Sequence, residues 1–330
     1  MAHLVYLKEN IRYYYQKYAQ FVDPAVKFLF SFVALTLFQM MFPYNNAVNK
    51  AILFVVVSAV QAFLPMSFLY YTASVLALLN LWKTSVEMLL MFFCLVLIEF
   101  LLFVRMDRRY AFITILTPIL FFLKLEYFLP VLLGMTIGFN GILPAVGGIF
   151  IYYFSLYTKD AIALLTTSSG TEMGVGMSRI MNLMVIDKSL LVVLVTFCLV
   201  IFISTLLYQL FHEKAWMFAI IIGNITMVLI MLSGRLIFEL NYSIVRVFVE
   251  AFLAMGLAVL VQFFEGIGDF SRMEKVSFED DEYIYYVKAV PKIKVSQSEH
   301  NVTDIKSEEE EETFDFSMMD SEEKEQIKRE

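Results

Sequence analysis

Long apolar runs separated by short polar interruptions dominate the chain from residue 26 to residue 264. A helix needs about 20 mostly apolar residues to cross the roughly 30 Å hydrocarbon core of a bilayer. The pattern therefore predicts membrane-spanning helices over five of these runs: 26–42, 86–104, 190–210, 215–233 and 242–264.

Two further runs are too long for one straight helix each. Residues 51–82 are broken by Gln61 and Pro65, and an unbroken helix there would extend ~48 Å. We expect two short helices hinged near Pro65. Residues 111–157 contain several Gly and Pro residues and predict three short segments, near 111–123, 125–140 and 142–157. The total is about ten short or broken transmembrane helices, with 158–188 as a polar loop.

The ends of the chain have a different character. Residues 1–24 alternate apolar and polar positions at spacings of three and four and are rich in Tyr. This pattern is typical of a helix lying in the headgroup region, although a short soluble helix packed on a neighbour is the alternative. Asp23-Pro24 is a favourable helix start, so a transmembrane domain is expected over 25–265.

Composition supports the membrane assignment and excludes most other classes. Hydrophobic residues make up 60% of the 330 residues and charged residues 17%, against about 45–50% and about 25% in soluble domains. The predicted fold class is an all-α, polytopic integral membrane helix bundle. Cys94 and Cys198 lie in apolar runs and form neither a CxxC motif nor a zinc set.

The charge is divided unevenly along the chain. Residues 1–264 carry a net charge of +4 and residues 265–330 a net charge of −11. The predicted cytoplasmic part has a short segment, 266–296, that includes the strand-like stretch 282–295, followed by a disordered acidic tail, 297–330. No basic stripe suggests a nucleic-acid partner.

Positive charge predicts the orientation. Lys8, Arg12, Lys17 and Lys27 flank the first span, and Arg105, Arg108 and Arg109 follow residue 104. The positive-inside rule places both groups in the cytoplasm and so predicts cytoplasmic N- and C-termini, in the cell membrane. Lys159, Arg179 and Lys188 then lie outside, against the rule.

A stripe of small residues marks the broken region. Gly134, Gly138, Gly141, Ala145 and Gly148 are spaced by three and four and would share one face of a continuous helix. Close helix packing is one explanation of this stripe. The other uses Asn140 and Pro144, since a helix broken here exposes backbone groups at membrane depth, as in transporters.

Ionisable residues inside the apolar runs are the remaining candidates. Glu99 has no charged partner within four residues and lies five residues before the end of its run. Arg235, Glu239, Arg246 and Glu250 are spaced four, seven and four apart and would fall on one helix face. Intramembrane acids are functional candidates by default; the alternative for Arg246–Glu250 is an ion pair that fixes helix depth. The pathway candidates are Glu99, Glu250, Arg246 and Asn140.

Known catalytic signatures are absent from the sequence. It contains no HExxH, GxSxG or GxxxxGK[ST] motif, and His3, His212 and His300 all lie outside the apolar runs. We therefore expect no enzyme, no cofactor and no metal site.

These patterns favour a permease-like protein that moves a small solute or ion. The alternative is a non-transporting membrane scaffold or regulator that recruits a cytosolic protein through residues 278–330. An intramembrane enzyme is a third, weaker hypothesis.

Overall fold

The computed structural model describes residues 2–45, 51–167, 175–210, 215–240, 242–265, 274–279 and 284–289. In this part of the chain there are eleven α-helices: α1 Ala2–Met40, α2 Ala51–Gln61, α3 Phe68–Trp82, α4 Val86–Glu99, α5 Arg108–Phe122, α6 Phe128–Thr136, α7 Ile142–Thr167, α8 Val175–Ile186, α9 Lys188–Leu210, α10 Ala215–Phe238 and α11 Ile244–Glu265. A π-helix, Phe100–Val104, continues α4, and a 3₁₀ turn, Gly138–Gly141, precedes α7.

Six of the described helical segments are long and apolar enough to cross a membrane: Lys17–Met40, Val86–Val104, Gly138–Ala163, Lys188–Leu210, Ala215–Phe238 and Ile244–Gln262. By helix length and composition the protein is a multi-pass membrane protein, and the predicted all-α character of this domain is confirmed. The ten expected segments all occur as helices. Four of them, α2, α3, α5 and α6, are too short to qualify as full spans.

The break expected near Pro65 is confirmed. The α2 helix ends at Gln61 and α3 begins at Phe68, with the intervening turn closed by hydrogen bonds such as Leu64 N–H to Gln61 O at 3.1 Å. A second pair of short helices, α5 and α6, is joined by a turn in which Lys124 has a φ of 59°.

The predicted start of the first span at Asp23-Pro24 is wrong. The α1 helix continues through both residues, and its only non-helical φ and ψ angles, −113° and 17°, occur at Tyr18. The Asp23 carboxylate accepts a hydrogen bond from the Tyr15 hydroxyl and is therefore engaged within the helix. Of the amphipathic helix predicted over 1–24, the side chains of residues 1–14 and 16 lie outside those that the structure describes.

The predicted loop 158–188 is mostly helical. The α7 helix runs on to Thr167, and α8 occupies Val175–Ile186. At the start of the predicted loop, Lys159 and Asp160 are exposed, whereas Thr158 and Ala161 on either side are buried. The two charges therefore face outward from a helix that continues to bury its other side. Residues 168–174 of the predicted loop lie outside the described ranges.

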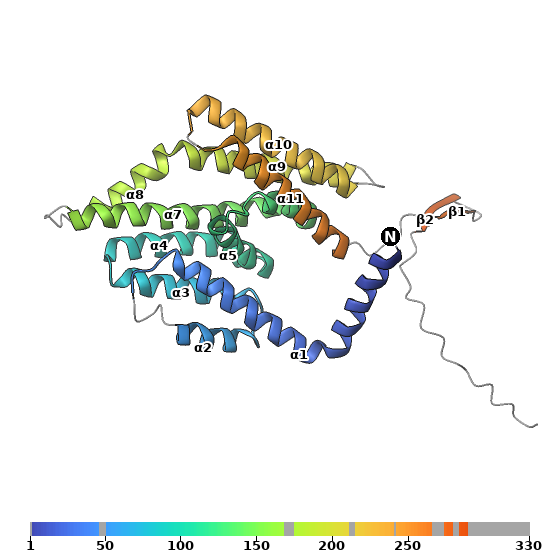
Figure 1. Cartoon of the computed structure of the whole chain (residues 1–330), viewed down its shortest axis with the longest axis horizontal. Helices are drawn as coiled ribbons and strands as arrows, with labels where there is room; N and C mark the ends of the chain where they lie inside the picture. Colours follow the sequence, from blue (N-terminus) through green and yellow to red (C-terminus); the bar gives the residue numbers. More distant parts are fainter. Residues whose placement is uncertain are drawn as a thin grey trace, which may run out of the picture. The chain divides into compact units, whose positions relative to one another are not determined.

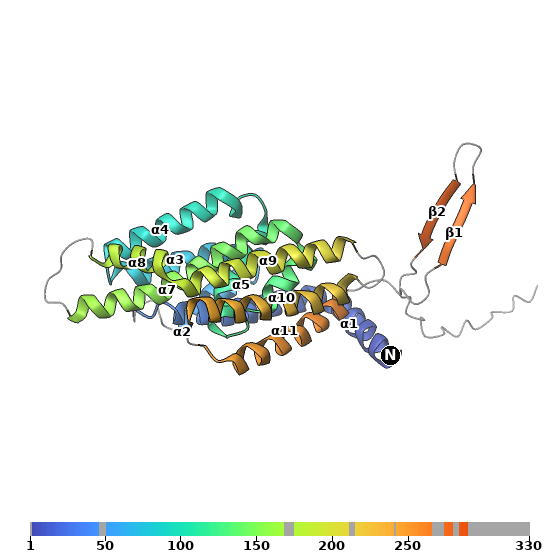
Figure 2. The same ribbon diagram turned by 90° about the horizontal axis from the view of Figure 1, so that it is seen from above.

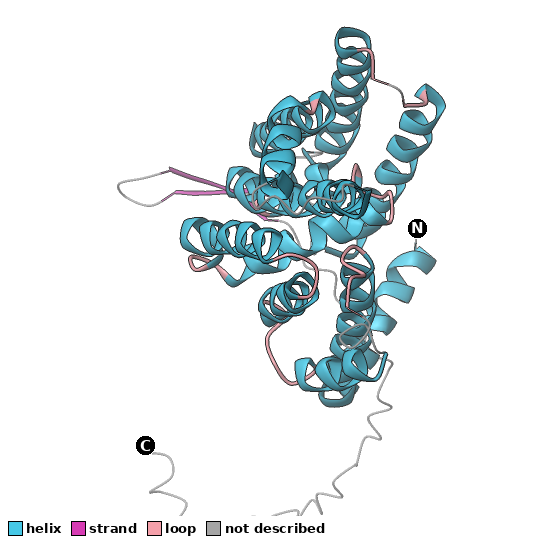
Figure 3. Cartoon of the chain, turned by 90° about the vertical axis from the view of Figure 1, so that its left-hand side faces the viewer, coloured by secondary structure: helices cyan, strands magenta, loops and turns pink. Residues whose placement is uncertain are grey.

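The helices of this domain lie roughly along one common direction (Figures 1 and 2), and Figure 3 looks nearly along their axes. The α9 helix packs against α10 and α6, and α7 packs against α5. Large, fully buried side chains of the core include Phe38 on α1, Phe92 on α4, Phe154 on α7 and Phe197 on α9.

Two strands follow the helices in the chain. β1, Glu274–Glu279, pairs antiparallel with β2, Ile284–Ala289, with Val276 opposite Val287. β2 falls inside the stretch 282–295 for which a strand was expected. Apart from β2 and the last two residues of β1, the predicted partner segment 278–330, including the acidic tail 297–330, lies outside the described residues.

Candidate functional site

The small-residue stripe does not lie on one continuous helix. The α6 helix ends at Thr136, and Gly138 adopts a φ of +74° in the 3₁₀ turn before α7. A left-handed φ favours glycine because it has no Cβ. The helix is therefore interrupted here, as the hypothesis of a broken, transporter-type helix requires. Asn140 is exposed and Pro144 is buried.

The glycines instead allow separate close approaches. A Cβ on Gly134 would lie 2.6 Å from the Cβ of Ser204 on α9, and one on Gly148 would lie 2.4 Å from the Cβ of Thr117 on α5. A Cβ on Gly141 would lie 3.3 Å from the Cβ of Leu133 on the preceding helix α6, a tight contact within the broken region itself. The stripe thus serves packing against two different neighbours rather than one common face.

The predicted four-residue charged stripe is wrong. The α10 helix ends at Phe238, and Glu239 has a φ of 54°, so Arg235 and Glu239 lie on a different element from α11. Arg235 instead donates to the Tyr242 carbonyl at 2.5 Å. The pair within α11 does form, with Arg246 Nε 2.5 Å from Glu250 Oε1.

Glu126 joins this pair to make a cluster of three charged side chains. Arg246 Nη2 lies 3.7 Å from Glu126 Oε1. Glu126 comes from the turn between α5 and α6, so the cluster links that turn to the first turns of α11. It borders a cavity of about 290 Å³, here named the acidic cavity, whose other polar lining residues are Tyr127, Tyr152, Tyr153, Asp187, Ser189 and Tyr242.

The two glutamates are much less exposed than their arginine. Their side chains are each 10% exposed, against 45% for Arg246. Glu126 Oε2 and Glu250 Oε2 are buried without a hydrogen-bond donor. Because a buried acceptor without a donor is costly, both oxygens are available to a cationic or hydrogen-donating ligand.

Burial also changes the acidity of Glu126, which lies outside the six candidate spans. Desolvation raises the pKa of its carboxyl to about 7; Glu250 raises it further, and Arg246 and Lys124 oppose the rise. The side chain therefore titrates near neutral pH. Sequence analysis did not select Glu126, although a single acid beside Lys124 in an otherwise apolar stretch was a usable signal.

Asp187 has a structural role at the edge of the same cavity. Its Oδ1 accepts the Ser189 backbone N–H at 2.8 Å, and its Oδ2 accepts the Tyr157 hydroxyl at 2.7 Å. Both oxygens are thus engaged in capping α9 and attaching it to α7. Its negative charge still adds to that of the two glutamates.

Glu99 forms a separate site. It is the last residue of α4, just before the π-helix, and is 3% exposed. The Tyr70 hydroxyl on α3 donates to its Oε2 at 2.9 Å, whereas its Oε1 is buried without a donor. A Cβ on Gly147 would lie 3.2 Å from that free oxygen. Glu99 is therefore bound by Tyr70 from another helix, and π-helical turns are frequent at functional sites.

Removal of the Tyr70 hydroxyl should destabilise the protein. Tyr70→Phe deprives Glu99 of its hydrogen-bond donor, at an expected cost of about 1–3 kcal/mol. Thermal unfolding in detergent measures this loss. The matched control is Tyr71→Phe, since Tyr71 is the neighbouring residue and is 36% exposed. Equal melting temperatures for the two variants would contradict the assignment.

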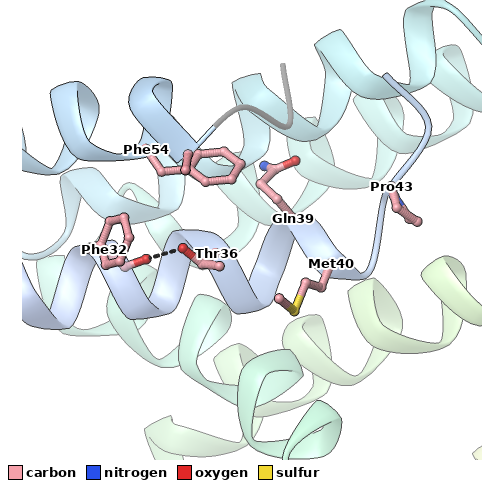
Figure 4. Close-up of a pocket in the computed structure, with 7 residues that line it drawn as sticks. Phe32, Thr36, Gln39, Met40, Pro43 and Phe54 are labelled. Carbon is pink, nitrogen blue, oxygen red and sulfur yellow. Dashed lines mark hydrogen bonds between the residues drawn. The ribbon is translucent and has the colours of Figure 1, made fainter. Parts of the chain in front are cut away.

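A second cavity lies between α1 and α2 and measures about 240 Å³. Figure 4 shows Phe32, Met40 and Phe54 around it, with Thr36 donating to the Phe32 carbonyl at 2.7 Å. The other polar side chain, Gln39, bonds to Asn80 on α3 and to the Ala73 carbonyl. Both polar groups are engaged within the fold, so this hollow offers little to a polar ligand.

Comparison of the chain with protein-family models, with curated proteins and with solved structures finds no match. Among the described residues, no group of three or more His, Cys, Asp or Glu side chains is placed to hold a metal ion.

Proposed function

We propose that this protein is a permease-like carrier of a small solute or ion, and that the acidic cavity is its binding site for a cation. The observation that carries the proposal is the pair of buried carboxylates, Glu126 and Glu250, each with one oxygen lacking a donor. Such groups in a membrane bundle are expensive to maintain and mark substrate or ion pathways.

The charge of the cavity favours a cation over an anion. Three carboxyl groups, those of Glu126, Asp187 and Glu250, face one guanidinium, that of Arg246, in the described lining. The volume of about 290 Å³ is at the lower end of the range for small-molecule sites. A small amine or a hydrated monovalent cation fits both properties.

The position of the cavity supports access from one end of the bundle. Glu126 follows the C-terminal end of α5, Asp187 precedes α9, and Arg246 lies in the first turn of α11. The arginines at the N-terminal end of α5 lie ~22 Å away along that helix. We propose that both chain termini lie on the cytoplasmic side of the cell membrane. The cavity then faces the opposite side.

Cation flux through reconstituted protein tests the proposal. Proteoliposomes would be assayed with radiolabelled small amines, zwitterionic amino acids and monovalent cations. Glu126→Gln and Glu250→Gln should each reduce cation flux at least tenfold, because each removes one negative charge and one acceptor oxygen. Asp160→Asn is the matched control, since Asp160 is exposed on α7 away from the cavity.

The flux should also depend on pH. Protonation of Glu126 below about pH 7 removes its charge, so cation flux should fall as the pH decreases through that value. The charged or titratable groups around Glu126 are Glu250, Arg246, Lys124, Asp187, Tyr127, Tyr152, Tyr153 and Tyr242. The Glu126→Gln variant should lose this pH dependence. Flux no greater than that of empty vesicles for every solute would reject the carrier and favour the scaffold alternative.

A further inference from the structure

A larger groove lies at the other end of α5, away from the acidic cavity. It measures about 560 Å³ and runs between the α2–α3 turn, α5 and α6. Its walls are mainly apolar, and its sides include Phe112 and Leu116 on α5 and Leu129 and Leu132 on α6. Arg108 and Arg109 border the same groove. It therefore combines an apolar channel with a cationic end.

The two arginines lie at the level of lipid headgroups. They begin α5 only four residues after the candidate span Val86–Val104 ends. Charged residues directly after a span occupy the interfacial region. Leu116 lies eight residues further along α5, or ~12 Å deeper by helical rise. The groove thus extends from the headgroup level into the hydrocarbon region.

The groove is long enough for part of an acyl chain. Because α6 follows α5 after a short turn, Thr136 at the end of α6 returns towards the arginines, while Leu129 at its start lies deeper. Thr136 is exposed and Leu132 is half-buried. The apolar walls therefore reach a surface from which a bilayer lipid can enter.

The charge at the mouth is net positive. Arg108 and Arg109 line this end of the groove, and the acid next to them in the sequence is Asp107. Asp107 accepts the Arg109 backbone N–H at 2.9 Å, and its carboxylate is 3.8 Å from Arg109 Nε, whose side chain is 74% exposed. An exposed contact of that length contributes little, so a phosphate can replace it. Guanidinium groups bind phosphate oxygens in a bidentate manner.

We propose that this groove binds an anionic phospholipid of the surrounding bilayer, with its phosphate on Arg108 and Arg109 and one acyl chain between α5 and α6. The charged mouth selects the headgroup, and the apolar walls hold the chain. This site shares no lining residue with the acidic cavity, so it does not depend on the carrier function.

Native mass spectrometry of the full-length chain in detergent tests the proposal, with dioleoylphosphatidylglycerol and dioleoylphosphatidylcholine as probes. Wild-type protein should retain phosphatidylglycerol in preference to phosphatidylcholine. The double variant Arg108→Gln, Arg109→Gln should weaken phosphatidylglycerol binding about tenfold. Arg105→Gln is the matched control, since Arg105 is exposed in the same segment but does not line the groove.

A second variant tests the apolar part while keeping both arginines. Thr136→Trp places a large side chain at the exposed edge of the groove and should also reduce phosphatidylglycerol binding. Melting temperatures close to that of the wild type would show that the variants remain folded. Equal retention of the two lipids, equal loss in the Arg105 control, or full binding by the Thr136 variant would each overturn the proposal. Displacement of the lipid by millimolar inorganic phosphate would likewise overturn it, because it would mean that the site recognises the phosphate without the chain.

Discussion

Replacement of Gly148 by alanine should lower the melting temperature of the protein by roughly 6–10 °C. The new Cβ would lie 2.4 Å from Thr117 Cβ and 2.7 Å from the Thr114 carbonyl oxygen. Both contacts are on α5, and one is with backbone, so a side-chain rotation cannot relieve them. Overpacking of this kind costs about 1–3 kcal/mol, and we expect the upper end because α5 and α7 must separate; about 3 kcal/mol corresponds to that shift in melting temperature.

The matched control for this substitution is Gly256→Ala in α11. A Cβ at Gly256 meets no atom within 4 Å, and alanine favours a helix over glycine by about 1 kcal/mol. Its melting temperature should therefore equal or slightly exceed that of the wild type. Thermal unfolding of both variants in the same detergent provides the comparison. If Gly148→Ala were as stable as Gly256→Ala, the close packing of α5 on α7 would be wrong.

Apolar run length was sufficient to predict most of the helices. Backbone N–H and C=O groups inside a bilayer have no water to bond to and must bond to one another. An apolar run that enters the lipid therefore forms a helix. Pro65 marked the break between α2 and α3 correctly for a local reason: proline lacks an N–H and disfavours helical geometry in the residue before it. The helix boundaries followed from the sequence where the cause was local.

The errors arose where tertiary contacts decided the structure. Lys159 and Asp160 suggested a loop, but a helix can expose two charges on one side while burying Thr158 and Ala161 on the other. The supposed stripe from Arg235 to Glu250 required one continuous helix, and the left-handed φ of Glu239 shows that the chain turns instead. Nothing local at a non-glycine residue signalled that conformation.

The candidate site was only half predictable for the same reason. Arg246 and Glu250 are four residues apart on one helix, so their ion pair follows from helical geometry alone. Glu126 is 120 residues before Arg246 in the sequence and meets it only through packing of the α5–α6 turn against α11. Tyr70 likewise reaches Glu99 from another helix. Contacts between side chains on different helices depend on how the helices pack against one another. The sequence of a single apolar run does not determine that packing.

Arg246→Met should destabilise the protein by about 2–3 kcal/mol at pH 8. The variant keeps an unbranched, flexible side chain and removes the one cationic group in the described lining of the acidic cavity. Loss of one partner of a fully buried ion pair costs about 3–5 kcal/mol, because the other charge remains uncompensated. The expected value is lower here because Arg246 is 45% exposed. Thermal or denaturant unfolding of purified protein in detergent measures the change.

The defect should be smaller at pH 6 than at pH 8. Burial already raises the pKa of Glu126 to about 7, and removal of the neighbouring positive charge raises it further. The folded protein then binds a proton more tightly than the unfolded chain does, so its stability decreases as the pH rises from the ordinary carboxyl pKa to the raised value. At acid pH the Glu126 carboxylate is protonated, so the buried negative charge that lost its partner is removed.

Two further variants identify the cause. Arg179→Met removes an exposed arginine from α8 and should leave stability within about 0.5 kcal/mol of the wild type at both pH values. The triple variant Arg246→Met, Glu126→Gln, Glu250→Gln removes all three charges and should recover most of the loss, because no buried charge remains unpaired. If Arg246→Met were no less stable than Arg179→Met, or if the triple variant failed to recover, the three side chains would not form an electrostatic unit. The cation-binding role proposed for the cavity would then lose its basis.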